Sequence, residues 1–252
     1  MGSSTGYTLL ESGLSGSTNN TLTLPTTSGT LLTTGSTTGI SGSAISTGTV
    51  AEAYGGTGTS TGYYGFKNRI INGAMNIWQR GTSFTSVANA GSTPQYTADR
   101  MFGYRGSGWA ANLDVSQQTG FGQFQYCLRA QRTSGTSSTA VMVVGQIIES
   151  VNMYDLQGQS ITLSFYCRAG SNFSGGTVSP QIYFSTAANQ TSASLAVGTW
   201  TGQTVQSSTV TPTTTATQYT FTATVPSNAL SMGVIFVWTP SGTAGANDYL
   251  DF

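Results

Sequence analysis

Apolar and polar residues alternate along most of the chain after residue 65, and this period of two constrains the fold more than any other feature. Every second residue is apolar in "SITLSFYC" (160–167), and in "QYTFTATV" (218–225) the residues Tyr219, Phe221, Ala223 and Val225 share one face. Segments rich in Gly, Ser and Thr separate these stretches and are typical of turns. The pattern predicts an all-β domain over residues 66–252, most plausibly a β-sandwich of the jelly-roll type.

The strands expected from this pattern have short spacings, so we expect neighbouring strands to pair antiparallel. The segment "VMVVGQIIESV" (141–151) fits a strand that runs into a short helix, although a strand alone is also open. The expected strands are 68–79, 109–117, 123–133, 140–149, 160–168, 177–185, 218–225 and 232–239, with a final strand starting at Asp248.

Residues 1–65 form a block of a different composition, dominated by Gly, Ser and Thr. Its short apolar alternations, such as Leu22 and Leu24, are separated by Pro and Gly. One copy of this block could not bury enough apolar surface to offset the entropy of ordering it. We therefore expect an extended shaft or attachment segment, which either stays a flexible linker or winds with identical copies into a fibre. The glycines of "YGGTGTSTGYYG" (54–65) indicate a joint and lack the spacing of a phosphate-binding loop.

Charged residues make up only 6% of the chain, and the formal net charge is zero. The basic residues all fall between Lys67 and Arg168 and form no cluster that could neutralise a row of phosphates, so we expect no nucleic-acid partner. The longest apolar runs, such as "MGVIFVW" (232–238), are far shorter than the roughly 20 residues of a membrane span, so we expect no membrane insertion. The N-terminus shows no basic region followed by an apolar core, as a secretory signal would.

The chain contains no His, which excludes Ser-His-Asp and Cys-His catalysis and His-ligated zinc. Only carboxylates could serve as catalytic groups, and those of the domain show no distinctive spacing. Asp248 and Asp251, with backbone carbonyls, are candidates for a structural Ca²⁺ site, but no DxDxDG-type loop supports it. We therefore predict no catalytic residues, no metal and no cofactor.

The two cysteines, Cys127 and Cys167, are expected to point to opposite faces of their strands. Cys167 shares the apolar face of its segment, whereas Cys127 lies on the face opposite Phe124, Tyr126 and Leu128. Opposite faces argue against a disulfide, so we predict two free thiols, as suits assembly in a reducing cytoplasm.

Several motifs resemble the C-terminal domains of bacteriophage tail-fibre and receptor-binding proteins. They are "NRIINGAMNIWQRGTSF" (68–84), "YTADRMF" (96–102), "LRAQRTSG" (128–135), "VGQIIES" (144–150) and "LQGQSITLSFYCRAG" (156–170). The flanking "TLTLPTTSGTLLTT" and "YGGTG" are similar to fibre-shaft and joint sequences. The resemblance implies a jelly-roll domain similar to carbohydrate-binding modules, usually displayed as a homotrimer, that binds a host surface polysaccharide without catalysis. It also implies attachment to other tail proteins through the N-terminal segment, and a place in a virion tail fibre assembled in the host cytoplasm.

Arg80 and Asp99, in two of these motifs, are predicted to form a partly buried ion pair across neighbouring strands, since a buried charge is costly unless paired. A contact from Arg80 or Arg100 to an acidic sugar is the functional alternative. Trp200, Trp109 and Tyr104 lie near loops and are the candidates for glycan binding, because sugar CH groups pack on aromatic rings. Packing in the core or against a neighbouring chain is the alternative for these rings.

The leading hypothesis is therefore a tail-fibre structural protein that binds a host glycan. An enzyme that depolymerises host polysaccharide with a carboxylate pair is one alternative, and it predicts an acidic groove. A purely architectural tail or capsid-decorating protein is the other, and it predicts that Trp200 and Trp109 are buried against neighbouring chains.

Overall fold

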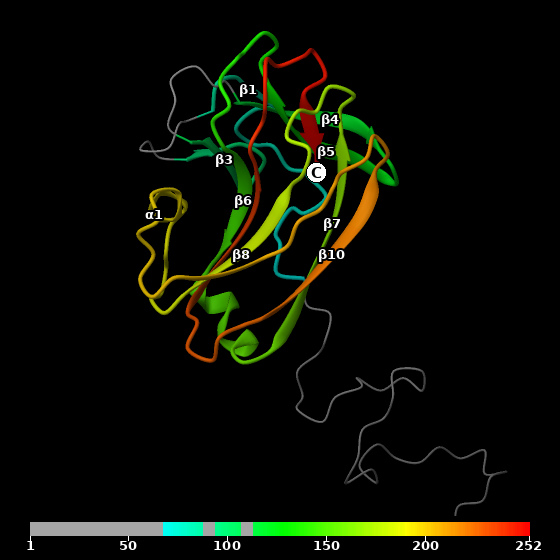
Figure 1. Cartoon of the computed structure of the whole chain (residues 1–252). Coiled ribbons are helices and arrows are strands. Elements are labelled where there is room, and N and C mark those ends of the chain that lie inside the picture. The colour runs from blue at the N-terminus through cyan, green and yellow to red at the C-terminus, as the bar shows by residue number, and fades with distance from the viewer. Residues whose placement is uncertain (1–67, 88–93, 107–112) are drawn as a thin grey trace, which may run out of the picture. The chain divides into compact units, whose positions relative to one another are not determined.

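The computed structural model describes residues 68–87, 94–106 and 113–252, which fold as a β-sandwich of two sheets (Figure 1). The predicted 1–65 segment lies outside the described residues. Every strand pair found within them is antiparallel. In order across the sheet, sheet A consists of β1 (Ser83–Phe84), β4 (Leu113–Phe121), β5 (Phe124–Arg132), β12 (Tyr249–Asp251), β7 (Ser160–Ala169) and β10 (Thr217–Thr224). Sheet B consists of β2 (Gln95–Tyr96), β3 (Met101–Arg105), β6 (Met142–Ile148), β11 (Ser231–Trp238), β8 (Ser179–Ser185) and β9 (Thr204–Ser207).

The chain crosses repeatedly from one sheet to the other, which gives the predicted jelly-roll arrangement. After β3 in sheet B come β4 and β5 in sheet A, then β6 in sheet B and β7 in sheet A. The same alternation continues through β8 and β9, β10, β11 and β12. Strands that are distant in the sequence therefore become neighbours, and β12 lies between β5 and β7.

The core lies between the two sheets and is built by the alternation seen in the sequence. Along β10, Tyr219, Phe221 and Ala223 pack into it, while the intervening threonines face solvent. Along β7, Leu163 and Cys167 do the same. The expected strands from 109 to 248 are thus confirmed, with ends shifted by a few residues where the structure describes them.

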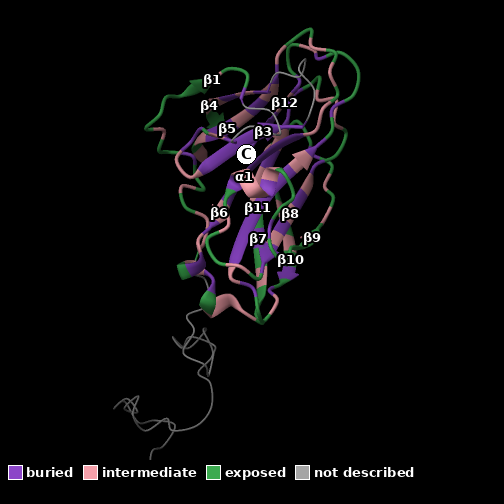
Figure 2. Cartoon of the chain, turned by 90° about the vertical axis from the view of Figure 1, so that its left-hand side faces the viewer, coloured by how far each residue is buried: buried purple, intermediate pink, exposed green. Residues whose placement is uncertain are grey.

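The strands β3, β6 and β11 of sheet B are buried on both of their faces. The run "MGVIFVW" in β11 is almost wholly buried because a second apolar cluster lies on the outer face of this sheet. The helix α1 (Ser192–Ala196) contributes Leu195 to that cluster, and Figure 2 shows α1 in front of the buried strands β3 and β11. A continuous apolar run therefore marks a strand covered on two sides.

The segment 68–79 is not a strand, contrary to prediction. Asn72 and Met75 have positive φ angles of 58° and 53°, which are incompatible with an extended strand. The Asn72 side chain holds the turn closed: its Nδ2 donates to the Ile77 carbonyl and its Oδ1 accepts from the Ile77 N–H. A buried amide, that of Gln146 on β6, bonds both backbone groups of Ile71. Asn72 and the buried Met75 of this motif therefore serve as framework.

Two short 3₁₀ helices follow β6, namely η3 (Ser150–Asn152) and η4 (Tyr154–Leu156), so the strand-then-helix interpretation of this region is the right one. Within the described ranges, no helix is both long enough and apolar enough to cross a membrane.

Candidate functional site

The outward-pointing side chains of sheet A form a surface that we call the open face. None of the described helices lies over it (Figure 1). Successive side chains on a strand point to opposite faces, so the residues between the core-facing ones point outward. They include Ser116, Gln125, Arg129, Tyr166, Arg168, Gln218, Thr220, Tyr249 and Asp251.

An arginine–aspartate–arginine cluster lies at the centre of the open face. The pairing register places Asp251 of β12 directly between Arg129 of β5 and Arg168 of β7. Arg129 Nε lies 2.7 Å from Asp251 Oδ1 and its Nη2 lies 2.9 Å from Oδ2. Arg168 contacts Oδ2 through both Nε and Nη2. The carboxylate is fully buried beneath two guanidinium groups that keep 19% and 22% of their side-chain surface exposed.

Aromatic rings fix both guanidinium groups in position. The Arg129 guanidinium lies 3.5 Å from the centroid of the Tyr249 ring, and that of Arg168 lies 5.4 Å from the centroid of the Phe121 ring. Gly170 lets the Tyr249 ring lie against the backbone, since a Cβ there would come within 2.7 Å of that ring. Burial lowers the pKa of Arg129, but the hydrogen bonds and the charge of Asp251 outweigh it and raise the pKa overall. The raised pKa keeps the Arg129 guanidinium charged at physiological pH, and its contacts with Asp251 and Tyr249 hold it in place.

The two cysteines are free, as predicted, and both are buried. Cys167 lies in the core, whereas Cys127 lies on the opposite side of sheet A, close to the charges of the Arg129 cluster. Burial, with a contribution from Asp251, raises the pKa of the Cys127 thiol to about 12. Burial likewise raises the pKa of Cys167. Neither thiol is a nucleophile near neutral pH, because the reactive thiolate is strongly disfavoured.

The predicted glycan-binding residues are not brought together on an exposed surface. Trp200 and Tyr104 do share the outer cluster of sheet B, but they are only 4% and 8% exposed. The Trp200 indole N–H donates to the Thr191 carbonyl at 2.9 Å, and its ring packs against Tyr183. Burial raises the pKa of Tyr104 to about 12. In this arrangement neither ring offers a face to a sugar, and both serve to cover sheet B. Trp109 lies outside the described residues.

Arg80 and Asp99 form the predicted ion pair, with Arg80 Nη1 3.2 Å from Asp99 Oδ1. Asp99 is largely buried, whereas 57% of the Arg80 side chain is exposed. Arg80 also lies over the ring of Tyr96. Asp99 itself sits in the turn before β3, and its N–H donates to the Ile77 carbonyl. The pair therefore ties the irregular segment 68–81 to the start of β3.

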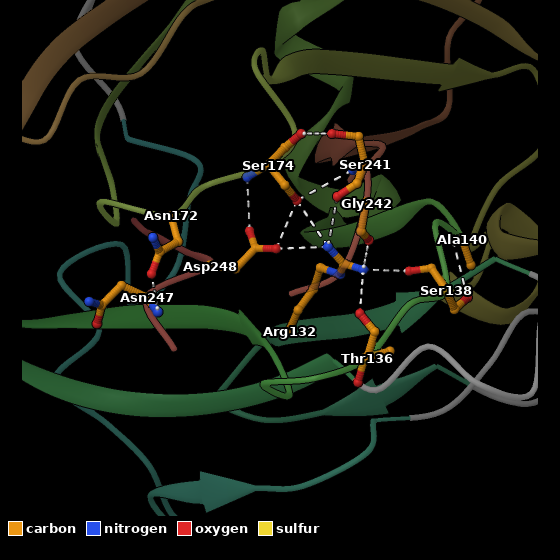
Figure 3. A network of polar contacts seen from close by, with 10 residues as sticks. All are labelled: Arg132, Thr136, Ser138, Ala140, Asn172, Ser174, Ser241, Gly242, Asn247 and Asp248. Atoms are coloured by element: carbon orange, nitrogen blue, oxygen red, sulfur yellow. Dashed lines mark hydrogen bonds and ion pairs between the residues drawn. The ribbon is translucent and has the colours of Figure 1, made fainter. Parts of the chain in front are cut away.

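A second arginine–aspartate pair is completely buried at the end of β5, as Figure 3 shows. Arg132 Nη1 lies 2.8 Å from Asp248 Oδ2, and both side chains are 1% exposed. The Arg132 guanidinium also donates to the carbonyls of Thr136, Ser138, Ser241 and Gly242. Ser174 completes the network by donating to both oxygens of Asp248. Three loops are fastened together around one guanidinium group.

These contacts show what binds Asp248 and Asp251, the two carboxylates considered for a Ca²⁺ site. Each carboxylate is bound by arginine, so its oxygens are occupied by N–H donors. Among the residues that the structure describes, no group of three or more His, Cys, Asp or Glu side chains is placed to hold a metal. The positive charge that balances these carboxylates comes from the protein itself.

The remaining described carboxylates are also engaged. Asp155 pairs with Arg69, and Glu149 pairs with Arg100. Asp114 accepts hydrogen bonds from the Ser86 N–H and the Thr133 hydroxyl. No two of the described carboxylates are left as an unpaired couple of the kind that glycoside hydrolysis uses.

The residues of the open face were not predicted as a site. The sequence did indicate that Arg129 points outward, since Gln125 and Arg129 lie on the face of their strand opposite the apolar residues. The neighbours of Arg129 in space could not be identified from that strand alone. Asp251 lies 122 residues away and Arg168 reaches the cluster only through β12.

No family model matches the chain, and no curated protein matches it either. Solved structures do match its fold at low identity. One is the enzymatically active domain of tailspike protein 4 from bacteriophage CBA120, with a TM-score of 0.42 and 13% identity, covering 73% of this chain and 20% of that one. This chain thus spans about a fifth of the length of that matched domain. Another is described as "CBM4 structure and function", with a TM-score of 0.41 and 17% identity over 73% of this chain and 94% of that one. A third is TmCBM61 in complex with β-1,4-galactotriose, with a TM-score of 0.37 and 10% identity over 74% of this chain and 93% of that one.

Proposed function

We propose that this protein is a non-catalytic, glycan-binding component of a virion tail fibre, and that the open face of sheet A is its binding surface. The observation that carries the proposal is the Arg129–Asp251–Arg168 cluster with the Tyr249 ring on an uncovered sheet. Sugars are bound by planar groups that pack against CH surfaces and by fixed donors that bond hydroxyl groups. The open face offers fixed donors, and the Tyr249 ring holds the Arg129 guanidinium in one rigid arrangement.

The donors that remain available support this role. Arg129 donates hydrogen bonds to Asp251 through Nε and Nη2, so its Nη1 remains available to a ligand. Gln125, on the same strand and face, is exposed. Exposed threonines of β10 extend the polar surface toward the edge of the sheet. A weak site of this kind gains affinity when several copies act together, which agrees with the homotrimer implied by the motif resemblance.

The motifs beginning at Asn68 and Tyr96 support the assignment to a tail fibre. They resemble receptor-binding tail proteins, and the structure shows that their polar residues hold the start of the sandwich together. In this proposal residues 1–65 attach the domain to other tail proteins, assembly takes place in the host cytoplasm, and the host surface polysaccharide is the ligand. The occupied carboxylates favour binding over depolymerisation.

Affinity electrophoresis in gels that contain a galactan, a xylan, a mannan or a polyuronate tests the proposal. We expect at least one polysaccharide to retard the protein without release of reducing ends. Tyr249→Ala should weaken that binding about tenfold or more, which corresponds to about 1.4 kcal/mol. Tyr154→Ala is the matched control, because Tyr154 is 59% exposed on η4 and not part of the open face.

Two results would contradict the proposal. Binding that is equally weakened by both tyrosine variants would place the site elsewhere, and release of reducing ends would favour the depolymerase. Light scattering on the full chain provides a separate check, since the fibre role predicts a particle of three times the 26.1 kDa chain.

A further inference from the structure

The arginine–aspartate–arginine cluster of the open face has an excess of positive charge. Arg129 and Arg168 share the single carboxylate of Asp251, so the cluster carries one positive charge that it does not balance itself. Asp114 is the other carboxylate that the described strands of sheet A point outward. It lies opposite Gln131 and accepts hydrogen bonds from a backbone N–H and a threonine hydroxyl. The described contacts give it no ion pair with either arginine of the cluster, so the local excess remains.

Both arginines bind Asp251 through the same side of the guanidinium group. Arg129 donates from Nε and Nη2, and Arg168 also donates from Nε and Nη2. A guanidinium group has a second pair of parallel N–H donors at its end, formed by Nη1 and Nη2, which we call the end edge. Arg168 Nη1 donates a long hydrogen bond of 3.4 Å to the Gly120 carbonyl. Among the described residues, Arg129 Nη1 has no such acceptor, so the end edge of Arg129 is the more accessible one.

The cluster holds this end edge in a fixed orientation. Asp251 accepts four N–H groups from the two arginines and is fully buried beneath them. The Tyr249 ring covers one flat side of the Arg129 guanidinium, with 3.5 Å from its central carbon to the ring centroid. A ligand therefore meets donors that are already ordered, which lowers the entropy cost of binding.

We propose that the open face binds its polysaccharide through the carboxylate of an acidic sugar, which accepts hydrogen bonds from the end edge of Arg129 and lies beside Arg168. This inference rests on the proposed function and adds the class of sugar to it. Two parallel N–H donors match the two oxygens of a carboxylate. The carboxylate also supplies the one negative charge that the cluster lacks, whereas a neutral hydroxyl group would leave the excess unbalanced. The attraction is strengthened because both arginines are largely buried.

The side chains around Arg129 favour a sugar over a simple anion. Ser116 lies directly opposite Arg129 on β4, and the Gln118 amide donates to the Ser116 hydroxyl. Gln125 is exposed on the same face of β5. These groups are uncharged, so they do not repel a carboxylate, and they can exchange hydrogen bonds with the hydroxyl groups of a sugar ring. One carboxylate with several hydroxyl groups is the pattern of a uronic acid.

Pairs of polymers that differ only in charge test this inference on the full chain. Polygalacturonate, alginate and hyaluronate are each compared with the methyl ester of the same polymer by affinity electrophoresis. Esterification keeps the sugar and its hydroxyl groups but removes the negative charge. We expect at least one of the acids to bind, and its ester to bind about tenfold more weakly or worse, because hydrogen bonds to a charged group are lost.

A variant of Arg129 locates the carboxylate. Arg129→Gln should weaken binding of the acid about tenfold and leave binding of the ester nearly unchanged, because the lost interaction is with the charge that the ester lacks. Arg168 still pairs with Asp251 in this variant, and urea unfolding verifies that it is folded. Arg80→Gln is the matched control. It removes the same charge from a side chain that is 57% exposed and outside the open face, so it should change binding of the acid by about twofold or less.

Several results would overturn the inference and leave the proposed function in place. Equal binding of acid and ester would do so, as would binding of a neutral galactan, xylan or mannan when no polyuronate binds. An equal loss of acid and ester binding in Arg129→Gln would mean that the arginine only shapes the surface. Dextran sulfate that binds as tightly as the best polyuronate would show that charge alone is recognised. If no polysaccharide of either kind binds, the proposed function itself fails, and the inference fails with it.

Discussion

The two arginine–aspartate clusters of sheet A use the same residue types on the same strands, yet they do different things. Arg129 and Arg132 are three residues apart on β5, and Asp248 and Asp251 are three residues apart at β12. An odd separation on a strand sends side chains to opposite faces. One cluster is therefore 1% exposed inside the protein, and the other presents two guanidinium groups at the surface.

The difference shows that environment decides the role of each cluster. The Arg132 guanidinium is surrounded by loop carbonyls and Asp248, and its hydrogen bonds hold the loops together. The Arg129 and Arg168 groups share a single carboxylate and keep donors available to a ligand. The first cluster is structural and the second is suited to recognition.

Replacing Arg132 should have the largest effect on stability. Arg132→Met leaves Asp248 charged and buried with only Ser174 as a partner, which should cost about 3–5 kcal/mol in the free energy of unfolding. Urea unfolding followed by tryptophan fluorescence measures this loss. The penalty should be nearly the same at low and high salt, because buried charges are poorly screened.

The double variant Arg132→Met with Asp248→Leu serves as the control. Removing both charges should restore a large part of the lost stability, because the cost arises from the unpaired carboxylate. If the double variant is as unstable as the single one, the carbonyl contacts of the guanidinium group dominate instead.

Replacing Asp251 should have an intermediate effect that depends on salt. Asp251→Asn keeps the shape but leaves two adjacent guanidinium groups without a counter-charge, which should cost about 2–3 kcal/mol. Because both arginines are partly exposed, added salt should screen their repulsion and reduce the penalty. A loss that does not change between 50 mM and about 500 mM NaCl would mean that the two clusters do not differ as proposed.

Much of the fold was predictable because alternation directly encodes which side chains face the core. The segments of β7, β10 and β11 were identified in this way. The segment 68–79 was misjudged because its irregular backbone is fixed by distant groups, such as the Gln146 side chain, and by positive φ angles that composition does not reveal. A turn with an asparagine at positive φ can contain enough apolar residues to resemble a strand.

The site was harder to predict than the fold because it depends on which strands become neighbours. The alternation of residues along β5 predicts that Arg129 points to an outer face. Its partners come from β12 and β7, because the jelly-roll crossings place β12 between β5 and β7. Trp200 was a candidate because of its glycine- and threonine-rich neighbours, yet α1 and the outer face of sheet B enclose it. Loop composition predicts that a residue lies between strands, and it does not predict what covers that residue.

The Arg80–Asp99 pair should show the smallest effect of the three. Arg80 is 57% exposed, so its charge remains well solvated with or without its partner. Arg80→Gln should therefore change the free energy of unfolding by about 0.5 kcal/mol or less, even though it lies in a conspicuous motif. Urea unfolding of Arg80→Gln beside Arg132→Met compares an exposed pair with a buried one in the same domain. A loss above about 2 kcal/mol for Arg80→Gln would contradict the contrast with Arg132, because exposed pairs do not reach that value.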